Sequence, residues 1–212
     1  ERLNPTGKKA LKEALRRNDM DYLCREALAQ ADAGAQILDL NVGLPEIDEP
    51  DMLCRAVQAV QAVCDLPLQL DTSDPVALER ALRIYNGRPL INSVMAAVFP
   101  LAKKYGAAVV ALTLDEGGIP STAAGRIAIA EKILATAKTY GLSEQDLIVD
   151  ALAMTVSTGP DNAAVALETL DYVRHRRGMQ TVLGVSNISF GLPRREKITA
   201  AFFTLAMGRG LS

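Results

Sequence analysis

Acid, amide and hydroxyl side chains recur at the ends of short apolar runs in this chain. The residues that follow or end these runs are Asp39, Asn41, Asp71, Asn92, Ser93, Asp115, Asp150 and Asn187. Short apolar runs that alternate with helical patterns of roughly ten residues predict βα units and a parallel sheet. We therefore expect a ring of hydrogen-bonding groups at the carboxyl ends of the strands, where α/β barrels place their functional residues. The alternative is that each polar residue only caps the next helix, which fits poorly where more loop follows.

The cysteines and the histidine do not indicate metal or triad chemistry. Cys24, Cys54 and Cys64 are widely spaced and form no Cys-x-x-Cys pair, so we predict neither a disulfide framework nor a thiolate zinc site. We expect them to be small buried hydrophobic residues. His175, the one histidine, lies in the basic run 174–177 before Gly178, which is typical of a solvated helix end. Ser-His-Asp catalysis is therefore not expected.

Composition narrows the class of protein. Hydrophobic residues make up 49% of the 212 residues and aromatic residues only 4%, which favours an aliphatic core such as that of a buried parallel sheet. The net charge of -2 and the lack of a basic stripe argue against nucleic-acid binding. No apolar stretch approaches the roughly 18 residues of a membrane span, and the charged amino end has no signal-peptide core. We therefore expect a cytoplasmic protein without a membrane contact.

Helical and strand patterns alternate along the whole chain, with no linker. Helices are predicted at 8–17, 20–33, 53–63, 76–84, 96–105, 126–140, 162–177 and 194–207, and strands at 36–42, 66–71, 89–94, 107–114, 147–152 and 180–188. This predicts one α/β domain over residues 1–212. Six strands are visible, whereas the common (β/α)8 TIM barrel has eight, so we expect such a barrel with both ends trimmed. The junction Val94-Met95 joins a strand to a helix without a loop, which indicates missing residues or an unusually tight connection.

Six segments at these strand ends resemble the pterin-binding family over essentially the whole chain. They are residues 1–7, 39–43, 70–73, 91–94, 150–152 and 184–191, which read ERLNPTG, DLNVG, LDTS, INSV, DAL and GVSNISFG. Their order is most similar to that of the methyltetrahydrofolate-binding domain of cobalamin-dependent methionine synthase and of the methyltetrahydrofolate:corrinoid methyltransferases. The resemblance implies a (β/α)8 barrel that binds the folate pterin at its mouth and passes the methyl group to cob(I)alamin.

The resemblance assigns pterin contacts to Asp71, Asn92 and Asp150. The chemistry agrees, because the pyrimidine edge of a pterin presents adjacent N–H donors and a carboxylate can accept two parallel hydrogen bonds from it. Asn92 has both a donor and an acceptor, which suits the mixed pattern of the rest of the ring. The same resemblance places Asp39 and Asn41 at the barrel mouth, although Asp39 could equally support the region of Arg2 and Asn4.

Asn187 is the predicted catalytic residue. Methyl transfer leaves an electron pair on the pterin nitrogen, and the resemblance places Asn187 beside that nitrogen. A side-chain amide can accept from the protonated nitrogen and donate to the nitrogen that is left behind. A hydrogen bond that strengthens in the transition state supplies roughly 1.5–3 kcal/mol. The alternative is an asparagine that only turns the loop.

Three functions remain open at this level. The first is methyl transfer from 5-methyltetrahydrofolate to cobalamin, as part of methionine synthesis. The second is dihydropteroate synthase, which would share Asp71, Asn92 and Asp150 but has a lysine where this chain reads Gly-Val-Ser-Asn187. The third is a pterin-binding module without turnover. Cobalamin is expected on a partner domain or subunit, because the one histidine is not in an Asp-x-His-x-x-Gly motif. The sequence leaves a homodimer and the final methyl acceptor open.

Overall fold

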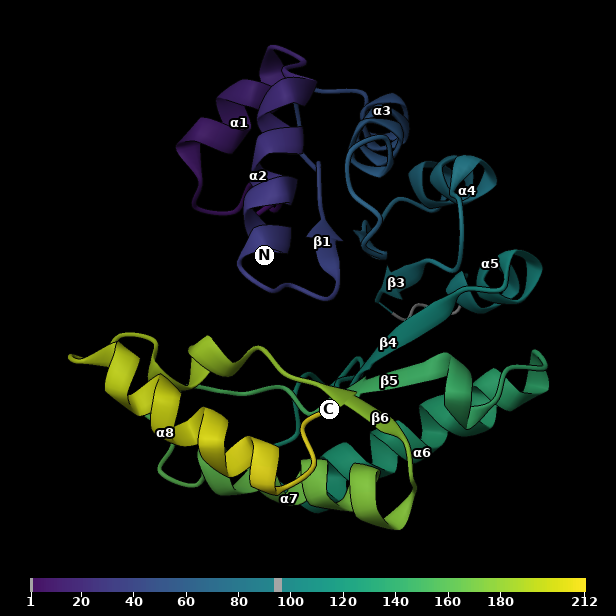
Figure 1. The fold of residues 1–212 in the computed structure, drawn as a ribbon. Coiled ribbons are helices and arrows are strands. Elements are labelled where there is room, and N and C mark those ends of the chain that lie inside the picture. The colour runs from purple at the N-terminus through teal and green to yellow at the C-terminus, as the bar shows by residue number, and fades with distance from the viewer. Residues whose placement is uncertain (1, 94–96) are drawn as a thin grey trace. The chain divides into compact units, whose positions relative to one another are not determined.

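Parallel strands and helices alternate in the computed structural model, which describes residues 2–93 and 97–212 (Figure 1). The strands are β1 (Leu38–Leu40), β2 (Leu68–Asp71), β3 (Leu90–Asn92), β4 (Ala108–Leu112), β5 (Leu147–Asp150) and β6 (Gln180–Val182). The helices are α1 (Lys9–Arg16), α2 (Met20–Asp32), α3 (Glu49–Gln61), α4 (Pro75–Ile84), α5 (Val98–Tyr105), α6 (Ala123–Thr139), α7 (Asn162–Asp171) and α8 (Arg195–Gly208). Short helical turns η1 (Glu144–Asp146), η2 (Tyr172–Arg176) and η3 (Val185–Ser189) complete the described elements.

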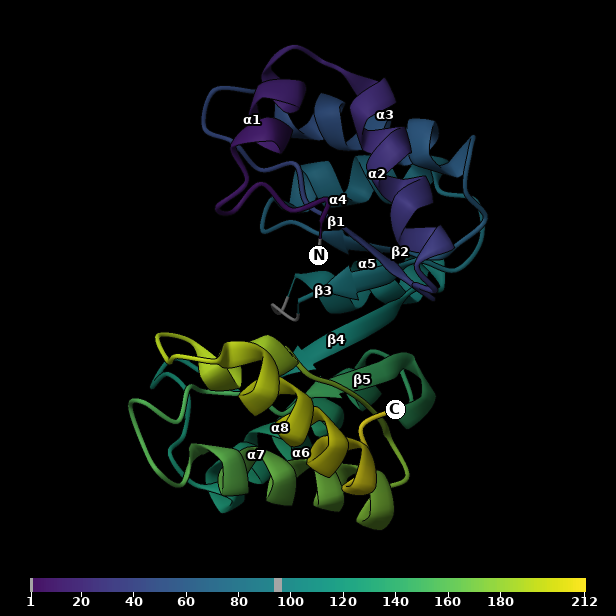
Figure 2. The same cartoon turned by 60° about the vertical axis from the view of Figure 1, so that its left-hand side comes forward.

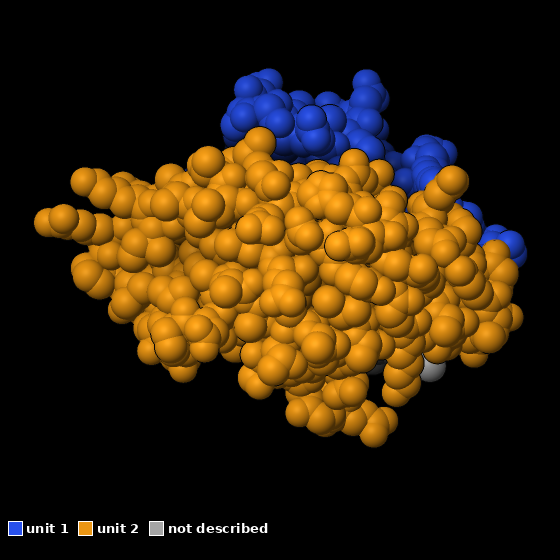
Figure 3. All heavy atoms as spheres, turned by 90° about the horizontal axis from the view of Figure 1, so that it is seen from below, with its two compact units in different colours: residues 1–109 blue, residues 110–212 orange. Residues whose placement is uncertain are grey.

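The chain divides into two compact units, residues 1–109 and 110–212, which are coloured separately in Figure 3. The division falls inside β4. Strands β1, β2, β3 and the start of β4 belong to unit 1, and the end of β4, β5 and β6 belong to unit 2. The order of the strands follows their order in the sequence. The prediction of one domain over 1–212 stays a prediction.

Unit 1 is built from parallel βα units in tight register. Leu40 pairs with Leu70, and Leu70 pairs with Ile91, so the strands are aligned at their carboxyl ends. Helices α2 and α3 pack together, as do α3 and α4 (Figures 1 and 2). Side chains such as Leu53, fully buried on α3, form the core beside the sheet.

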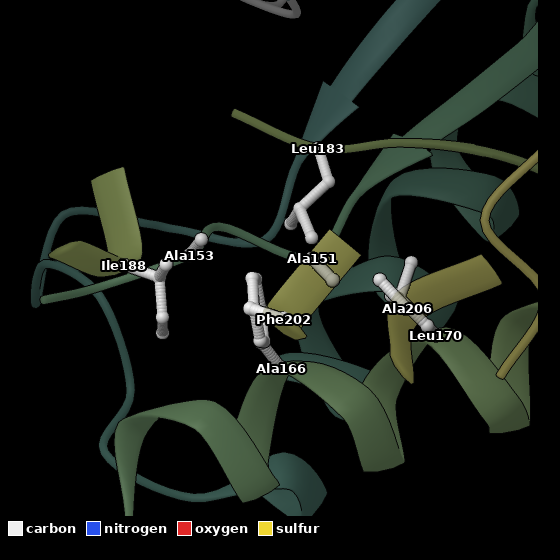
Figure 4. Close-up of a cluster of buried hydrophobic side chains, with 8 residues drawn as sticks. All are labelled: Ala151, Ala153, Ala166, Leu170, Leu183, Ile188, Phe202 and Ala206. Atoms are coloured by element: carbon white, nitrogen blue, oxygen red, sulfur yellow. The ribbon is translucent and has the colours of Figure 1, made fainter. Parts of the chain in front are cut away.

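Unit 2 has its own apolar core. Helix α7 packs against both α6 and α8, and η3 packs against α8. Phe202 of α8 is 4% exposed and lies in a cluster with Ala151, Ala153, Ala166, Leu170, Leu183, Ile188 and Ala206 (Figure 4). Four of these eight residues are alanines, and Phe202 is the largest side chain among them.

Some predicted boundaries were wrong, for local reasons. The predicted strand 180–188 ends at Val182, because the chain turns at Gly184 into η3. Helices α3 and α6 begin earlier than predicted, since Asp48 and Thr122 cap them through their side chains. The Val94-Met95 junction lies outside the described residues. His175 is exposed as predicted, whereas only Cys64 of the three cysteines is buried.

Candidate functional site

The strands of unit 1 present polar side chains on one face. Leu38 and Leu40 are fully buried, whereas Asp39 between them is only half-buried. The same alternation in β2 places Asp71 on the other face of the sheet from the buried Leu70. Asp39 accepts a hydrogen bond from Gln69 Nε2 at 2.6 Å. This contact is with the neighbouring strand β2, and the alternative that Asp39 supports the Arg2 and Asn4 region stays a prediction.

Asp71 at the end of β2 is the centre of a hydrogen-bonded group. Its Oδ2 accepts from Asn41 Nδ2 at 3.0 Å and from Asn4 Nδ2 at 3.3 Å. Asn92 is its register partner on β3 and is half-buried. Within the described residues no hydrogen bond reaches Asp71 Oδ1. The two amides therefore orient the carboxylate through Oδ2. Asn4 lies in one of the segments that resemble the family, but the sequence alone assigns it no role.

A second contact lies beside this group. The Thr72 hydroxyl donates to Glu49 Oε1, and Asn41 Oδ1 accepts from the backbone N of Gly43 at 2.9 Å. Glu49 is in the first turn of α3, where a carboxylate also complements the helix dipole. Nothing in the strand pattern pointed to Glu49, because it belongs to the helix that follows β1.

Asp150 at the end of β5 is the corresponding group of unit 2. Its Oδ1 accepts from the backbone N of Leu152 at 2.8 Å, and its register partner on β6 is Val182. Burial raises the pKa of the Asp150 carboxyl to about 6, against the hydrogen bond from Leu152 and the positive charge of Arg126. A carboxyl group whose pKa is shifted by burial and by a specific charged neighbour is a candidate functional residue.

Arg126 is a functional candidate that the sequence reading missed. It is 1% exposed, and it donates to the carbonyl oxygens of Pro120, Ala151 and Leu152. A signal was present, because Arg126 occupies the apolar stripe of α6 together with Ala123, Ile129, Ala130, Leu134 and Ala137. A charge on a buried helical stripe needs partners.

Asn187 lies in η3, just beyond β6, and its side chain is exposed. Its backbone N donates to the Gly184 carbonyl at 3.0 Å. A Cβ at Gly184 would lie 2.8 Å from Asn187 Nδ2, so the glycine makes room for the amide. The turn is fixed from two sides, since Val156 N donates to the Ile188 carbonyl and Arg195 Nη2 donates to the Ser186 carbonyl at 3.0 Å.

The capping alternative does not apply to the predicted residues. The helices that follow β2 and β5 have Asp74 and Asp161 at their N-cap positions, and α8 after η3 has Arg194 there. Asp71, Asp150 and Asn187 therefore serve no helix end. In the part of the chain that the structure describes, no group of three or more His, Cys, Asp or Glu side chains is arranged to hold a metal ion. Nor is any described helix long and apolar enough to cross a membrane.

The chain belongs to the pterin binding enzyme family, whose profile matches residues 1–212. It is 31% identical over 230 residues to a methionine synthase of Mycobacterium tuberculosis, with 100% of this chain and 19% of that protein covered. It is also 31% identical over 211 residues to a methylcorrinoid:tetrahydrofolate methyltransferase of Eubacterium limosum, covering 95% of this chain and 78% of that protein. The chain thus spans about a fifth of the methionine synthase that it matches.

Solved structures of dihydropteroate synthases share the fold. The enzyme of Xanthomonas albilineans in complex with 7,8-dihydropteroate has a TM-score of 0.68 at 18% identity, over 91% of this chain and 77% of that chain. The enzyme of Thermus thermophilus has a TM-score of 0.68 at 23% identity, over 90% of this chain and 78% of that chain. The predicted family and the predicted α/β class, a TIM-barrel type with part of the strands present, are confirmed.

Proposed function

We propose that this chain binds 5-methyltetrahydrofolate through its pterin ring and transfers the methyl group to cob(I)alamin carried by another domain or subunit, as part of methionine synthesis. In this proposal residues 1–212 act as one pterin-binding domain. The single observation that carries it is the state of the two carboxylates. Asp71 is oriented by two amides while its Oδ1 accepts no hydrogen bond from the described residues, and Asp150 is half-buried at the end of its strand.

The two carboxylates suit the donor edge of a pterin. Each can accept N–H hydrogen bonds, and an ionised acceptor makes these bonds roughly twice as strong as neutral ones. Asn92 supplies the donor and acceptor that the remainder of the ring needs. Asp39 and Asn41 act in support, because Asn41 orients Asp71 and Asp39 is joined to Gln69 on the same face.

Asn187 is assigned to the methyl-bearing nitrogen. The bond from that nitrogen to the methyl group breaks, its electron pair stays on the nitrogen, and the methyl group passes to the acceptor. An exposed amide that its own backbone turn fixes can accept from the protonated nitrogen and then donate to the free pair. Because this hydrogen bond strengthens as the transfer proceeds, it lowers the barrier, while most of the rate comes from positioning.

Sequence likeness favours methyl transfer over dihydropteroate synthesis. The methyltransferase relative is 31% identical over most of its length, whereas the synthases are at 18% and 23%. The turn after β6 reads Gly184-Val185-Ser186-Asn187 and has no lysine, which the family resemblance assigns to the synthase branch. A module without turnover would not need a glycine that clears room for Asn187.

Calorimetric titration with 5-methyltetrahydrofolate tests the binding part of the proposal. We expect Asp71→Asn and Asp150→Asn each to weaken binding by about 1.5–3 kcal/mol, the range for a hydrogen bond to a charged group. Asp161→Asn is the matched control, because Asp161 is exposed and its side chain caps no helix. Unchanged affinity in both test variants would refute the site.

A further inference from the structure

Arg126 is the one charged side chain that is fully buried in the described part of the chain. No carboxylate lies within ion-pair distance of its guanidinium among the described residues, and its partners are three main-chain carbonyl groups. Burial without an ion pair is costly for a cation. The other buried residues of helix α6 are alanine, isoleucine and leucine, so an apolar stripe alone does not explain the arginine.

The contacts of Arg126 join two loops at the carboxyl ends of β4 and β5. Its Nε donates to the Pro120 carbonyl at 2.9 Å, in the loop before α6. Its Nη1 donates to the carbonyls of Ala151 at 2.8 Å and Leu152 at 2.6 Å. Leu152 has a positive φ of 56°, which is rare for a residue with a side chain. Arg126 thus holds the strained turn whose backbone N–H binds Asp150.

Arg126 is also the charge that acts on Asp150. Thr113, beyond the end of β4, contacts only the main chain of Asp150, through its hydroxyl at 2.9 Å and its backbone N at 3.2 Å. Strand β6 presents Val182, which is uncharged, and the turn presents the Leu152 N–H. Among the described residues, the positive charge that lowers the pKa of Asp150 against its burial is that of Arg126.

We propose that Arg126 is the positioning residue of Asp150: it fixes the turn after β5 and supplies the charge that keeps the carboxylate ionised when a pterin covers it. This inference rests on the proposed function, in which Asp150 accepts hydrogen bonds from the pterin. A bound ring removes water from the carboxylate and so favours its protonated form. A protonated carboxyl would lose acceptor capacity, and the buried guanidinium opposes that loss without occupying the oxygen atoms.

The pH dependence of folate affinity tests this inference, with 5-methyltetrahydrofolate as the probe. In the wild type, affinity should fall below about pH 6 as Asp150 takes up a proton. We call this fall in affinity at low pH the acid limb. In Arg126→Gln the acid limb should move to a higher pH by about one unit, which is the lower end of the effect of a neighbouring opposite charge on a pKa. Affinity at pH 6.5 relative to pH 8.5 should then fall about four-fold, against less than about 1.5-fold in the wild type.

Arg126→Lys keeps the charge but not the planar fork of donors. We expect weaker binding at every pH with the acid limb in its wild-type place. Asp150→Asn should remove the part of the affinity loss at low pH that comes from Asp150. The pH dependence that remains in this variant belongs to the ligand, which is the same in all titrations, and it is subtracted from the other profiles. Arg176→Gln is the control, since Arg176 is exposed and its side chain has no hydrogen bond or ion pair among the described residues.

If Arg126 had a merely structural role, Arg126→Gln would lower the folate affinity by the same factor at all pH values, and that result would overturn the inference. Folding of each variant is checked by circular dichroism. If Arg126→Gln does not fold, Arg126→Lys decides: a wild-type acid limb supports the role of the charge and a displaced limb contradicts it. Absence of folate binding by the wild type would overturn the proposed function as well, so the two failures are distinguishable.

Discussion

Replacing Asp150 by asparagine should stabilise the protein while it weakens ligand binding. The carboxyl ionises at about pH 6 in the folded chain, compared with an ordinary pKa of 3.8. The folded state therefore keeps its proton longer than the unfolded state does. Stability from this residue is fully present below the unfolded pKa and is lost as pH rises through about 6. At ~1.36 kcal/mol per pKa unit, ionised Asp150 costs the folded state roughly 3 kcal/mol at pH 7.5.

An asparagine side chain at this position would be close to isosteric with the carboxylate and would keep an oxygen for the backbone N of Leu152, which now donates to Asp150 Oδ1 at 2.8 Å. We expect Asp150→Asn to raise the free energy of unfolding by up to roughly 3 kcal/mol at pH 7.5 and by only about 1 kcal/mol at pH 4.5. Urea denaturation followed by circular dichroism measures both values. Asp161→Asn, at an exposed carboxylate, should change stability by less than about 0.5 kcal/mol. An absent gain at pH 7.5, or an equal gain at both pH values, would refute the electrostatic reasoning.

Two further variants test the core and the Asn187 turn. Phe202→Ala should lower the free energy of unfolding by about 3–5 kcal/mol, because Phe202 is 4% exposed in the core of unit 2, whereas Phe203→Ala at a 46% exposed neighbour should cost far less. Urea denaturation measures both, and equal losses would contradict the assigned core. Gly184→Ala should slow methyl transfer several-fold at nearly unchanged folate affinity, since its Cβ would lie 2.8 Å from Asn187 Nδ2; Gly208→Ala, with nothing within 4 Å of its Cβ, should transfer normally. Stopped-flow kinetics measures the rate of methyl transfer, and a binding titration measures the folate affinity. A wild-type transfer rate for Gly184→Ala would contradict the prediction, because it would show that the turn tolerates the added carbon.

The strands were predictable because each is a short apolar run that ends near a polar residue, and in β1 and β2 polarity also follows a period of two. Leu38 and Leu40 flank Asp39, and Leu70 precedes Asp71, so burial and polarity alternate visibly in the sequence. Parallel register then brings Asp71 beside Asn92. The family resemblance added the roles of these residues, which the alternation alone does not specify.

Other parts of the candidate site depend on contacts that sequence separation hides. Arg126 binds carbonyl oxygens 25 and 26 residues away, at Ala151 and Leu152, and only its place on an apolar stripe hints at burial. Asn4 reaches Asp71 across 67 residues. The predicted strand beyond Val182 was wrong because apolar residues continue into η3, where the chain turns at Gly184. Apolar runs alone do not separate a strand from a short helical turn.

A single-turnover measurement with excess cob(I)alamin tests the central claim most directly. The wild type should transfer the methyl group of 5-methyltetrahydrofolate, and Asn187→Ala should slow that step about ten- to a hundred-fold while folate affinity falls much less, because the amide acts mainly in the transition state. An equal loss of rate and affinity would make Asn187 a binding residue only. No methyl transfer by the wild-type chain would contradict the proposed function.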